Sequence, residues 1–192
     1  MRQYWKKEPV ECLISQCEIN RLVKGLALRI SDDYRDRVRL DNPLLMVGIL
    51  KGAVIFLSDL VRQMDIPTSL DFMAVSSYGA STTSSGVVRI LHDLDASIEG
   101  RHVMVVEDIV DTGLTLQYLK NHLASRGPRS LRVCVLLDKP ERRQALVDVD
   151  YCGQEIPDKF VVGYGLDYDE KYRDLPHVAV VRDDEGGEKS ET

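Results

Sequence analysis

Three carboxylates and a polar turn are crowded into one short stretch, VVEDIVDTGLTL at residues 105–116. Glu107 and Asp108 follow two valines, and Asp111 comes three residues later. Neighbouring carboxylates can accept hydrogen bonds from the hydroxyls of a sugar, and a further carboxylate can take a proton from a nucleophile. Negative charge also stabilises a positively charged, oxocarbenium-like sugar. These acids therefore suit chemistry at the anomeric carbon of a ribose.

The residues after these acids are typical of an anion-binding turn. Thr112, Gly113 and Thr115 stand where the next helix is expected to begin. A helix N-terminus offers unpaired N–H groups to a phosphate, and the threonine hydroxyls add donors without adding charge. The turn is neither a Walker A loop nor a G-x-G-x-x-G turn. It indicates a ribose 5-phosphate, although a capped helix preceded by solvated acids is the alternative interpretation.

Apolar runs that suit buried strands alternate with helical patterns along the chain. This order predicts an α/β fold with a mostly parallel sheet, in which ligands bind beyond the carboxyl ends of the strands. The acids at 107 and 108 are expected just past such a strand. The predicted strands are residues 44–50, 69–75, 87–91, 102–106, 131–137, 160–162 and 178–181.

Three helices are predicted between these strands. The first begins at a capping box formed by Ser15 and Glu18 and ends before the charged stretch 32–39. The second covers residues 53–64, and the third covers residues 114–126 and ends at a Gly-Pro pair.

The length of 192 residues suits one domain with a full hydrophobic core, and no linker or repeat divides the chain. We expect a single domain at residues 1–182 and a disordered acidic tail at 183–192. The net charge of −6 disfavours nonspecific binding to nucleic acid or to an anionic membrane.

The four cysteines show no metal-binding spacing, and Cys134 lies in an apolar run that suits the core. Reduced thiols are typical of cytoplasmic proteins. The N-terminus has no signal-peptide pattern, and no apolar run is long enough to span a bilayer. The sequence therefore predicts a soluble cytoplasmic protein.

Residues 105–116 resemble the phosphoribosyl-diphosphate binding motif of type I phosphoribosyltransferases. Further segments resemble the bacterial hypoxanthine-guanine phosphoribosyltransferases: LKGA at 50–53, SSYG at 76–79, LLDKPERR at 136–143 and PDKFVVGYGLDYDEKYRDLPHVAVV at 157–181. The resemblance implies the type I phosphoribosyltransferase fold, a mostly parallel central sheet flanked by helices, with a small hood region formed from the chain ends. The implied reaction joins hypoxanthine or guanine to 5-phosphoribosyl 1-diphosphate in purine salvage, releasing diphosphate and IMP or GMP.

For the sugar phosphate, the resemblance implies that Glu107 and Asp108 hold the ribose 2- and 3-hydroxyls and contribute to a magnesium site. Asp111 takes the position of the general base that faces purine N7 as N9 attacks C1. A cap for the helix that starts at Gly113 is its alternative role, and the two are compatible. The implied substrate-binding residues of this segment are Glu107, Asp108, Ile109, Thr112, Gly113, Leu114 and Thr115. Some relatives carry a basic residue at the position of Leu114.

For the base, the resemblance implies that Lys139 donates to the 6-oxo oxygen. A cation prefers an acceptor, which favours 6-oxopurines over adenine, whose 6-amino group is a donor. A solvated lysine at a strand end is the alternative. Phe160 matches the ring that stacks on the purine, although its apolar pattern also suits the core. Val161 matches a residue that reads the base through its backbone.

For the diphosphate, the resemblance implies that Asp167 binds the magnesium ion and that Arg173 contacts phosphate oxygens, which suit its planar fork of donors. Solvated surface charge is the alternative for both, because they lie in the charged run DYDEKYRD. Arg142 and Arg143 follow Lys139 closely, and the sequence leaves open which of them faces the diphosphate.

Two loops complete the implied site. Lys51 and Gly52 match a loop that meets the diphosphate through backbone amides, and the family has a non-proline cis peptide there. Ser77 and Tyr78 begin a small polar loop that resembles a mobile lid, which would exclude water from a reactive sugar cation. A surface loop without this role has the same sequence pattern.

Two other classes of protein fit the sequence less well than the enzyme. A ligand-sensing regulator on the same fold would need a basic face or an added DNA-binding segment, and neither is evident. A receiver-type signalling domain would carry its acidic pair after an early strand, and here the pair lies mid-chain. The expected partners are small-molecule substrates, with no nucleic acid and no membrane, and the resemblance implies a homodimer or homotetramer.

Overall fold

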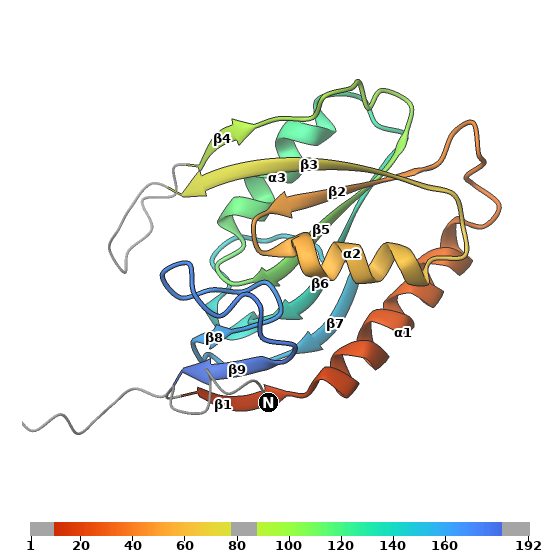
Figure 1. The fold of residues 1–192 in the computed structure, drawn as a ribbon. Helices are drawn as coiled ribbons and strands as arrows, with labels where there is room; N and C mark the ends of the chain where they lie inside the picture. The colour runs from red at the N-terminus through yellow and green to blue at the C-terminus, as the bar shows by residue number, and fades with distance from the viewer. Residues whose placement is uncertain (1–9, 78–87, 182–192) are drawn as a thin grey trace, which may run out of the picture.

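The computed structural model describes residues 10–77 and 88–181 (Figure 1). Tyr78, the rest of the expected lid and the tail at 183–192 lie outside the described residues, as does the side chain of Ser77. In the described part of the chain, no helix has the length and apolar character needed to cross a membrane.

A six-stranded sheet forms the centre of the molecule, with strand order β4-β3-β2-β5-β6-β7. Every neighbouring pair is parallel except β3 and β4, which confirms the predicted sheet type. The strands are β2 (Leu44–Leu50), β3 (Thr68–Ser77), β4 (Val88–His92), β5 (His102–Val110), β6 (Ser130–Asp138) and β7 (Tyr151–Glu155). The central strands are apolar on both faces because helices cover both sides.

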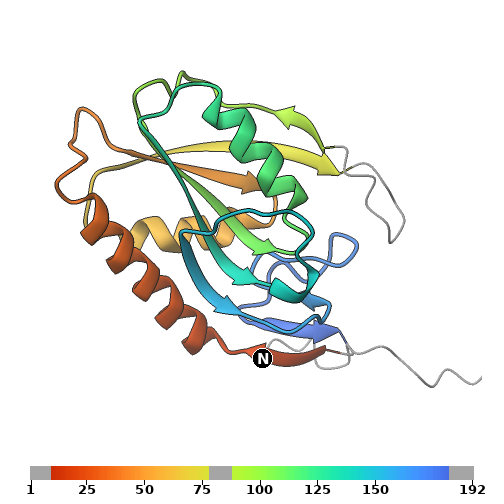
Figure 2. The same ribbon diagram turned by 180° about the vertical axis from the view of Figure 1, so that it is seen from behind.

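Helix α1 (Gln16–Tyr34) and helix α2 (Ala53–Gln63) lie on one face of the sheet, and helix α3 (Leu114–Ala124) lies on the other (Figures 1 and 2). The capping box is present: the Glu18 N–H donates to Ser15 Oγ at 3.3 Å, and the Ser15 N–H donates to Glu18 Oε2 at 2.8 Å. The predicted end of this helix before residue 32 is wrong. The helix continues to Tyr34, whose side chain is fully buried beneath it.

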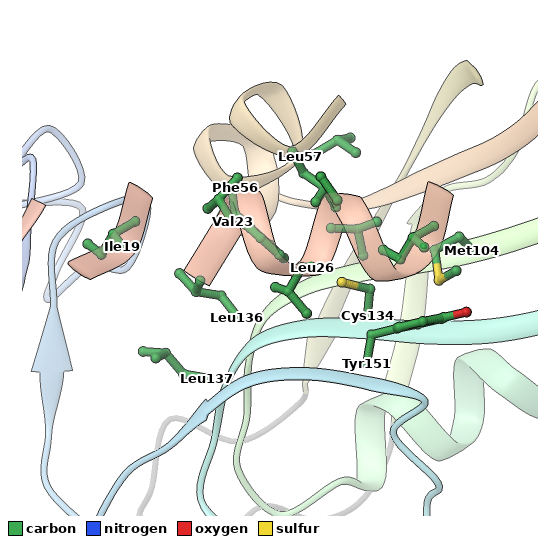
Figure 3. Close-up of a cluster of buried hydrophobic side chains, with 14 of the residues drawn as sticks. Ile19, Val23, Leu26, Phe56, Leu57, Met104, Cys134, Leu136, Leu137 and Tyr151 are labelled. Atoms are coloured by element: carbon green, nitrogen blue, oxygen red, sulfur yellow. The ribbon is translucent and has the colours of Figure 1, made fainter. Parts of the chain in front are cut away.

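The core under α1 and α2 is a single cluster of buried side chains (Figure 3). Cys134 is fully buried in this cluster, as its apolar surroundings in the sequence predicted. The labelled members are Ile19, Val23, Leu26, Phe56, Leu57, Met104, Cys134, Leu136, Leu137 and Tyr151. Dispersion and removal of apolar surface from water hold the two helices on the sheet.

A small antiparallel sheet joins the two ends of the described chain. Its strands are β1 (Val10–Ile14), β9 (Val178–Val181) and β8 (Val161–Val162), in the order β1-β9-β8. This is the expected hood region. The loop between β8 and β9 lies beside the carboxyl ends of β2 and β5 (Figure 1).

Two strand boundaries differ from the prediction and matter for the site. Strand β5 extends to Val110, so Glu107 and Asp108 lie inside the strand and not past its end. The strand continues because β6 supplies partners as far as the Val110–Asp138 pair. Strand β8 begins at Val161, which leaves Phe160 outside the strand.

Candidate active site

Two adjacent acids project from the end of β5. The Oε2 atom of Glu107 is shielded from solvent and has no hydrogen-bond partner among the described residues. Burial raises the pKa of Glu107 well above its usual range, and the neighbouring Asp108 raises it further. Burial also raises the pKa of Asp108 to about 6, although the Ile109 N–H donates to its Oδ1 at 3.0 Å. Burial therefore makes the charged form of both acids unfavourable. A ligand with hydrogen-bond donors, or a cation, would stabilise that charged form.

The turn after these acids encloses a cavity of about 120 Å³. Gly113 has a φ of 80° and begins α3, and a Cβ there would lie 3.0 Å from both Arg143 Cδ and Val147 Cγ1. Glycine is required because the backbone is left-handed and the space is already filled. The cavity is lined by Glu107, Ile109, Val110, Asp111, Thr112, Gly113, Thr115 and Leu116. This set contains five of the seven substrate-binding residues predicted in the segment, without Asp108 and Leu114, and it lies at a helix N-terminus that suits an anion.

Asp111 does not cap the helix. Gly113 is the N-cap and has no side chain, and within the described residues no N–H of this helix donates to the Asp111 carboxylate, so the capping alternative for Asp111 is wrong. Asp111 Oδ1 instead lies 3.1 Å from Nε of Arg142, without the alignment of a hydrogen bond. Arg142 also approaches Asp158, at 3.6 Å. The local turn bond comes from Leu114, whose N–H donates to Thr112 Oγ1 at 3.4 Å.

Arg142 and Arg143, either of which could face the diphosphate according to the sequence, have different surroundings. Arg142, on the 3-10 turn Pro140–Arg142, faces the acids of the site. Arg143 forms an ion pair with Asp138 and packs its Cδ against Gly113, so it supports the turn from beneath.

Lys139 lies at the end of β6, directly beside the end of β5. Its N–H donates to the Val110 oxygen at 2.9 Å, which brings it next to Asp111. Only 5% of the residue is exposed, so the interpretation as an ordinary solvated lysine is wrong. Its Nζ lies 4.0 Å from Asp158 Oδ1. A buried ammonium with one distant partner can donate a hydrogen bond to an oxygen of a ligand.

Phe160 is not a core residue. It is 54% exposed and contacts Tyr168 edge to face, with ring centroids 5.5 Å apart. The alternative that places it in the core is therefore wrong, and the exposed ring is available for stacking on a flat ligand. The next residue, Val161, is buried in β8.

Asp167 and Arg173 are bound to one another. Arg173 Nη2 lies 2.8 Å from Asp167 Oδ1, and its Nη1 donates to the Gly165 oxygen at 2.8 Å. The side chains are 24% and 29% exposed, for Arg173 and Asp167 respectively, so neither is a freely solvated charge. Glu170 joins this cluster, because its N–H donates to Asp167 Oδ2 at 2.9 Å and its Oε2 pairs with Lys51 at 2.9 Å.

The loop after β2 fits closely against β5 and the hood. The Leu50–Lys51 peptide is cis, as the resemblance implies. A Cβ on Gly52 would lie 1.8 Å from Asp108 Oδ2, and a Cβ on Gly165 would lie 2.1 Å from the Gly52 oxygen. The two glycines allow three segments to meet at one point. This brings Lys51 and Gly52 to the same site as the acids of β5.

Sequence reasoning missed Asp158 and Gly165 as parts of this site. Asp158 lies between Lys139 and Arg142 in space but well after both in the chain. Gly165 has a φ of 103°, and its only signal in the sequence is a glycine within YGLDY.

Comparisons with known proteins agree with this geometry. The family model described as phosphoribosyl transferase domain matches residues 15–169. A hypoxanthine-guanine phosphoribosyltransferase of Mycobacterium avium is 55% identical over 88% of this chain and 84% of its own length. The Bacillus subtilis protein of the same name is 46% identical over 92% of this chain and 96% of its own length.

Solved structures give the same result. A hypoxanthine phosphoribosyltransferase from Staphylococcus aureus superposes with a TM-score of 0.87 and 43% identity, over 95% of this chain and 96% of that one. The Trypanosoma cruzi hypoxanthine phosphoribosyltransferase, in complex with its product IMP, has a TM-score of 0.86 and 46% identity, over 92% of this chain and 97% of that one. The chain therefore belongs to the phosphoribosyltransferase family.

Proposed function

We propose that this protein transfers a phosphoribosyl group to hypoxanthine or guanine, in purine salvage. The N9–C1 bond forms as the bond from C1 to the diphosphate oxygen breaks, giving IMP or GMP and free diphosphate. The proton on purine N7 goes to the carboxylate of Asp111. The names of the similar proteins from M. avium and B. subtilis support this activity.

The sugar phosphate is assigned to the segment from Glu107 to Thr115. The 5-phosphate occupies the cavity of about 120 Å³ at the start of α3, where neutral donors and the helix N-terminus suit its charge. Glu107 and Asp108 accept hydrogen bonds from the ribose hydroxyls, which offsets the burial of their charge. In this assignment the acids lie next to an anion site because they bind the sugar and not the phosphate.

The observation that carries the substrate class is Lys139. It is buried, it is hydrogen-bonded through its backbone to Val110, and it stands beside Asp111. An ammonium there donates a hydrogen bond to the 6-oxo oxygen of hypoxanthine or guanine and has no acceptor to offer to the 6-amino group of adenine. Phe160 supplies an exposed ring for stacking on the purine, and the backbone of Val161 contacts its edge.

The diphosphate is assigned to Arg173, to the loop at Lys51 and Gly52, and to the region of Ser77 and Tyr78. Arg173 and Lys51 already have carboxylate partners in Asp167 and Glu170. Binding of diphosphate would therefore exchange these partners for phosphate oxygens, which suit a guanidinium fork.

Magnesium is part of this proposal, and the residues present fit it. Mg²⁺ prefers oxygen ligands and is held by one or two carboxylates together with substrate phosphates. The unpartnered Oε2 of Glu107 and the raised pKa of Asp108 suit a nearby cation. Asp167, which acts electrostatically on Asp108, would complete the set after release from Arg173. When bound, the ion would neutralise and orient the leaving diphosphate.

Two broader parts of the proposal are the compartment and the assembly. The four free cysteines are typical of the reducing cytoplasm. A symmetric homodimer or homotetramer is expected because closed symmetric assemblies are the usual case for soluble enzymes. Size-exclusion chromatography with light scattering would measure the assembly directly.

The test is diphosphate release by the purified protein with magnesium and 5-phosphoribosyl 1-diphosphate. Hypoxanthine, guanine, xanthine and adenine would be supplied one at a time. We expect turnover with hypoxanthine or guanine and none with adenine. Tight binding of the sugar diphosphate without turnover on any purine would contradict the proposal and favour a ligand-sensing regulator.

A further inference from the structure

A second pocket lies at the opposite edge of the main sheet from the candidate active site. It has a volume of about 660 Å³ and lies where β5 and β6 begin, beside the segment that follows α1. The lining residues are Asp36, Arg37, Arg39, Asp41, Asn42, His102, Arg129 and Ser130. Since β5 is nine residues long, this pocket is separated from the acids at its other end by most of the length of a strand.

The arginines of this pocket differ from those around it. Among the described residues, Arg37, Arg39 and Arg129 have no carboxylate within the 4.0 Å of an ion pair. Just outside the pocket, Arg35 pairs with Asp65 at 3.2 Å, and Arg132 pairs with Asp33 at 3.0 Å. Three guanidinium groups without a carboxylate partner among the described residues therefore line this one pocket.

The floor of the pocket is fixed. His102 is 5% exposed, and its Nδ1 lies 2.6 Å from Ser130 Oγ. The buried ring of Tyr34 packs edge to face against His102, with ring centroids 5.5 Å apart. The Arg37 guanidinium lies over the Tyr34 ring, 5.8 Å from its centroid. Burial lowers the pKa of His102, and the positive charges of Arg129 and Arg37 lower it further.

The wall formed by the segment after α1 is also ordered. Arg39 and Asn42 exchange backbone hydrogen bonds, at 3.2 and 3.1 Å, across a tight turn. This turn presents Arg39 on the same pocket as Arg129, from a distant part of the chain. Two segments that are distant in the chain thus place three guanidinium groups around one space.

We propose that this pocket binds a phosphorylated small molecule that carries hydroxyl groups, such as a sugar phosphate. The unpaired guanidinium groups supply several donors to phosphate oxygens, in a geometry that guanidinium suits. The two aspartates would repel a bare anion, but they accept hydrogen bonds from ligand hydroxyls. The volume falls within the range of small-molecule pockets and leaves room beyond a phosphate group.

The test follows the imidazole signals of His102 by NMR, assigned with His102→Gln, at constant ionic strength. The probes are glucose 6-phosphate, inorganic phosphate and glucose. We expect glucose 6-phosphate to move the His102 signals to saturation and to raise the pKa of His102 by about one unit, because a nearby anion favours the imidazolium. Inorganic phosphate should bind more weakly, and glucose should leave the signals unchanged.

Arginine variants distinguish binding at this pocket from nonspecific attraction of an anion to positive charge. Arg129→Gln should weaken the glucose 6-phosphate effect about tenfold or more, as expected for loss of a charged hydrogen bond. Arg39→Gln serves as the second variant, and circular dichroism checks the folding of both. Arg35→Gln, which removes a paired arginine outside the pocket, should leave the binding unchanged.

Three results would overturn the proposal. They are His102 signals that do not respond to glucose 6-phosphate, an equal response in the wild type and both pocket variants, and inorganic phosphate that binds as tightly as the sugar phosphate. The measurement uses no turnover, so its outcome is independent of the proposed transferase reaction.

Discussion

The two sides of the candidate active site handle charge in different ways. On the sugar-phosphate side, residues 107–115, burial raises the pKa of both Glu107 and Asp108, and Glu107 Oε2 has no partner in the described chain. On the base-and-diphosphate side, formed by Lys51, Lys139, Phe160, Asp167 and Arg173, the charged groups face carboxylates or a guanidinium.

This difference separates two ways of preparing for a ligand. The sugar-phosphate side carries unfavourable burial of charge in the free protein, and a ligand with donors relieves it. On the base-and-diphosphate side, Lys51 and Arg173 already have carboxylate partners, so a diphosphate must replace these protein partners. We expect substitution of the buried acids on the first side to affect stability and catalysis in opposite directions, and substitution within the Asp167–Arg173 pair on the second side to weaken both.

The largest expected effect is the loss of kcat in Asp111→Asn, which tests whether Asp111 is the general base. Asp111→Asn should lower kcat by about 10²–10⁴-fold, because the side chain no longer accepts a proton. Steady-state diphosphate release measures this loss. Asp148→Asn, the same change at a fully exposed carboxylate, is the control and should leave kcat unchanged. A loss below tenfold in Asp111→Asn would exclude it as the general base.

The next prediction compares an acid from each side by stability. Burial raises the pKa of Asp108 from 3.8 to about 6, so the folded state favours the neutral form. The free energy of unfolding should therefore fall as pH rises from 3.8 through 6 and stay low above that. Asp108→Asn removes this loss and should raise the free energy of unfolding at pH 8 by ~2–3 kcal/mol, measured in urea.

The matched variant on the other side should behave in the opposite way. Asp167→Asn removes the partner of Arg173 and should lower the free energy of unfolding by about 1–3 kcal/mol. Both variants should lose transferase activity. If both variants destabilise the protein at pH 8, the proposed difference between the two sides is wrong.

A third prediction concerns base choice alone. Lys139→Gln removes the buried ammonium and should lower kcat/KM for hypoxanthine by roughly 10–100-fold, as for loss of a charged hydrogen bond. The preference for hypoxanthine over adenine should fall as well, while binding of the sugar diphosphate stays close to normal. Lys159→Gln, at an exposed lysine, is the control. Unchanged discrimination against adenine would refute the role of Lys139.

The smallest expected effect is at Phe160. Phe160→Leu should raise KM for the base about 2–10-fold through lost stacking, with little change in stability because the ring is 54% exposed. Phe56→Leu gives the reverse pattern, because Phe56 is fully buried: lower stability and an unchanged KM. A large loss of stability in Phe160→Leu would show that the ring supports the hood and does not serve the base.

The contrast between the two sides also explains what the sequence could predict. The phosphate turn is contiguous, so Thr112, Gly113 and Thr115 carry their own local signal and line one cavity in the structure. The capping box at Ser15 is local for the same reason. The mostly parallel sheet followed from the alternation of apolar runs with helical patterns, whereas the strand order and strand β7 were not predicted.

Features that depend on distant partners were missed or misplaced. Strand β5 was ended too early because Glu107 and Asp108 look like loop residues, whereas pairing with β6 keeps them in the strand. Helix α1 was ended too early because nothing local marks the burial of Tyr34. The contribution of Asp158 arises only when the chain brings it back to Lys139.

The contact between Gly52 and Asp108 has an evolutionary consequence. Alanine at position 52 would place its Cβ 1.8 Å from Asp108 Oδ2, so alanine there is compatible only with a chain that has already lost or moved this acid. In such a lineage, the acid could not return until glycine did. Loss of the carboxylate at position 108 must therefore precede alanine at position 52. Once alanine is present at position 52, it prevents recovery of the carboxylate.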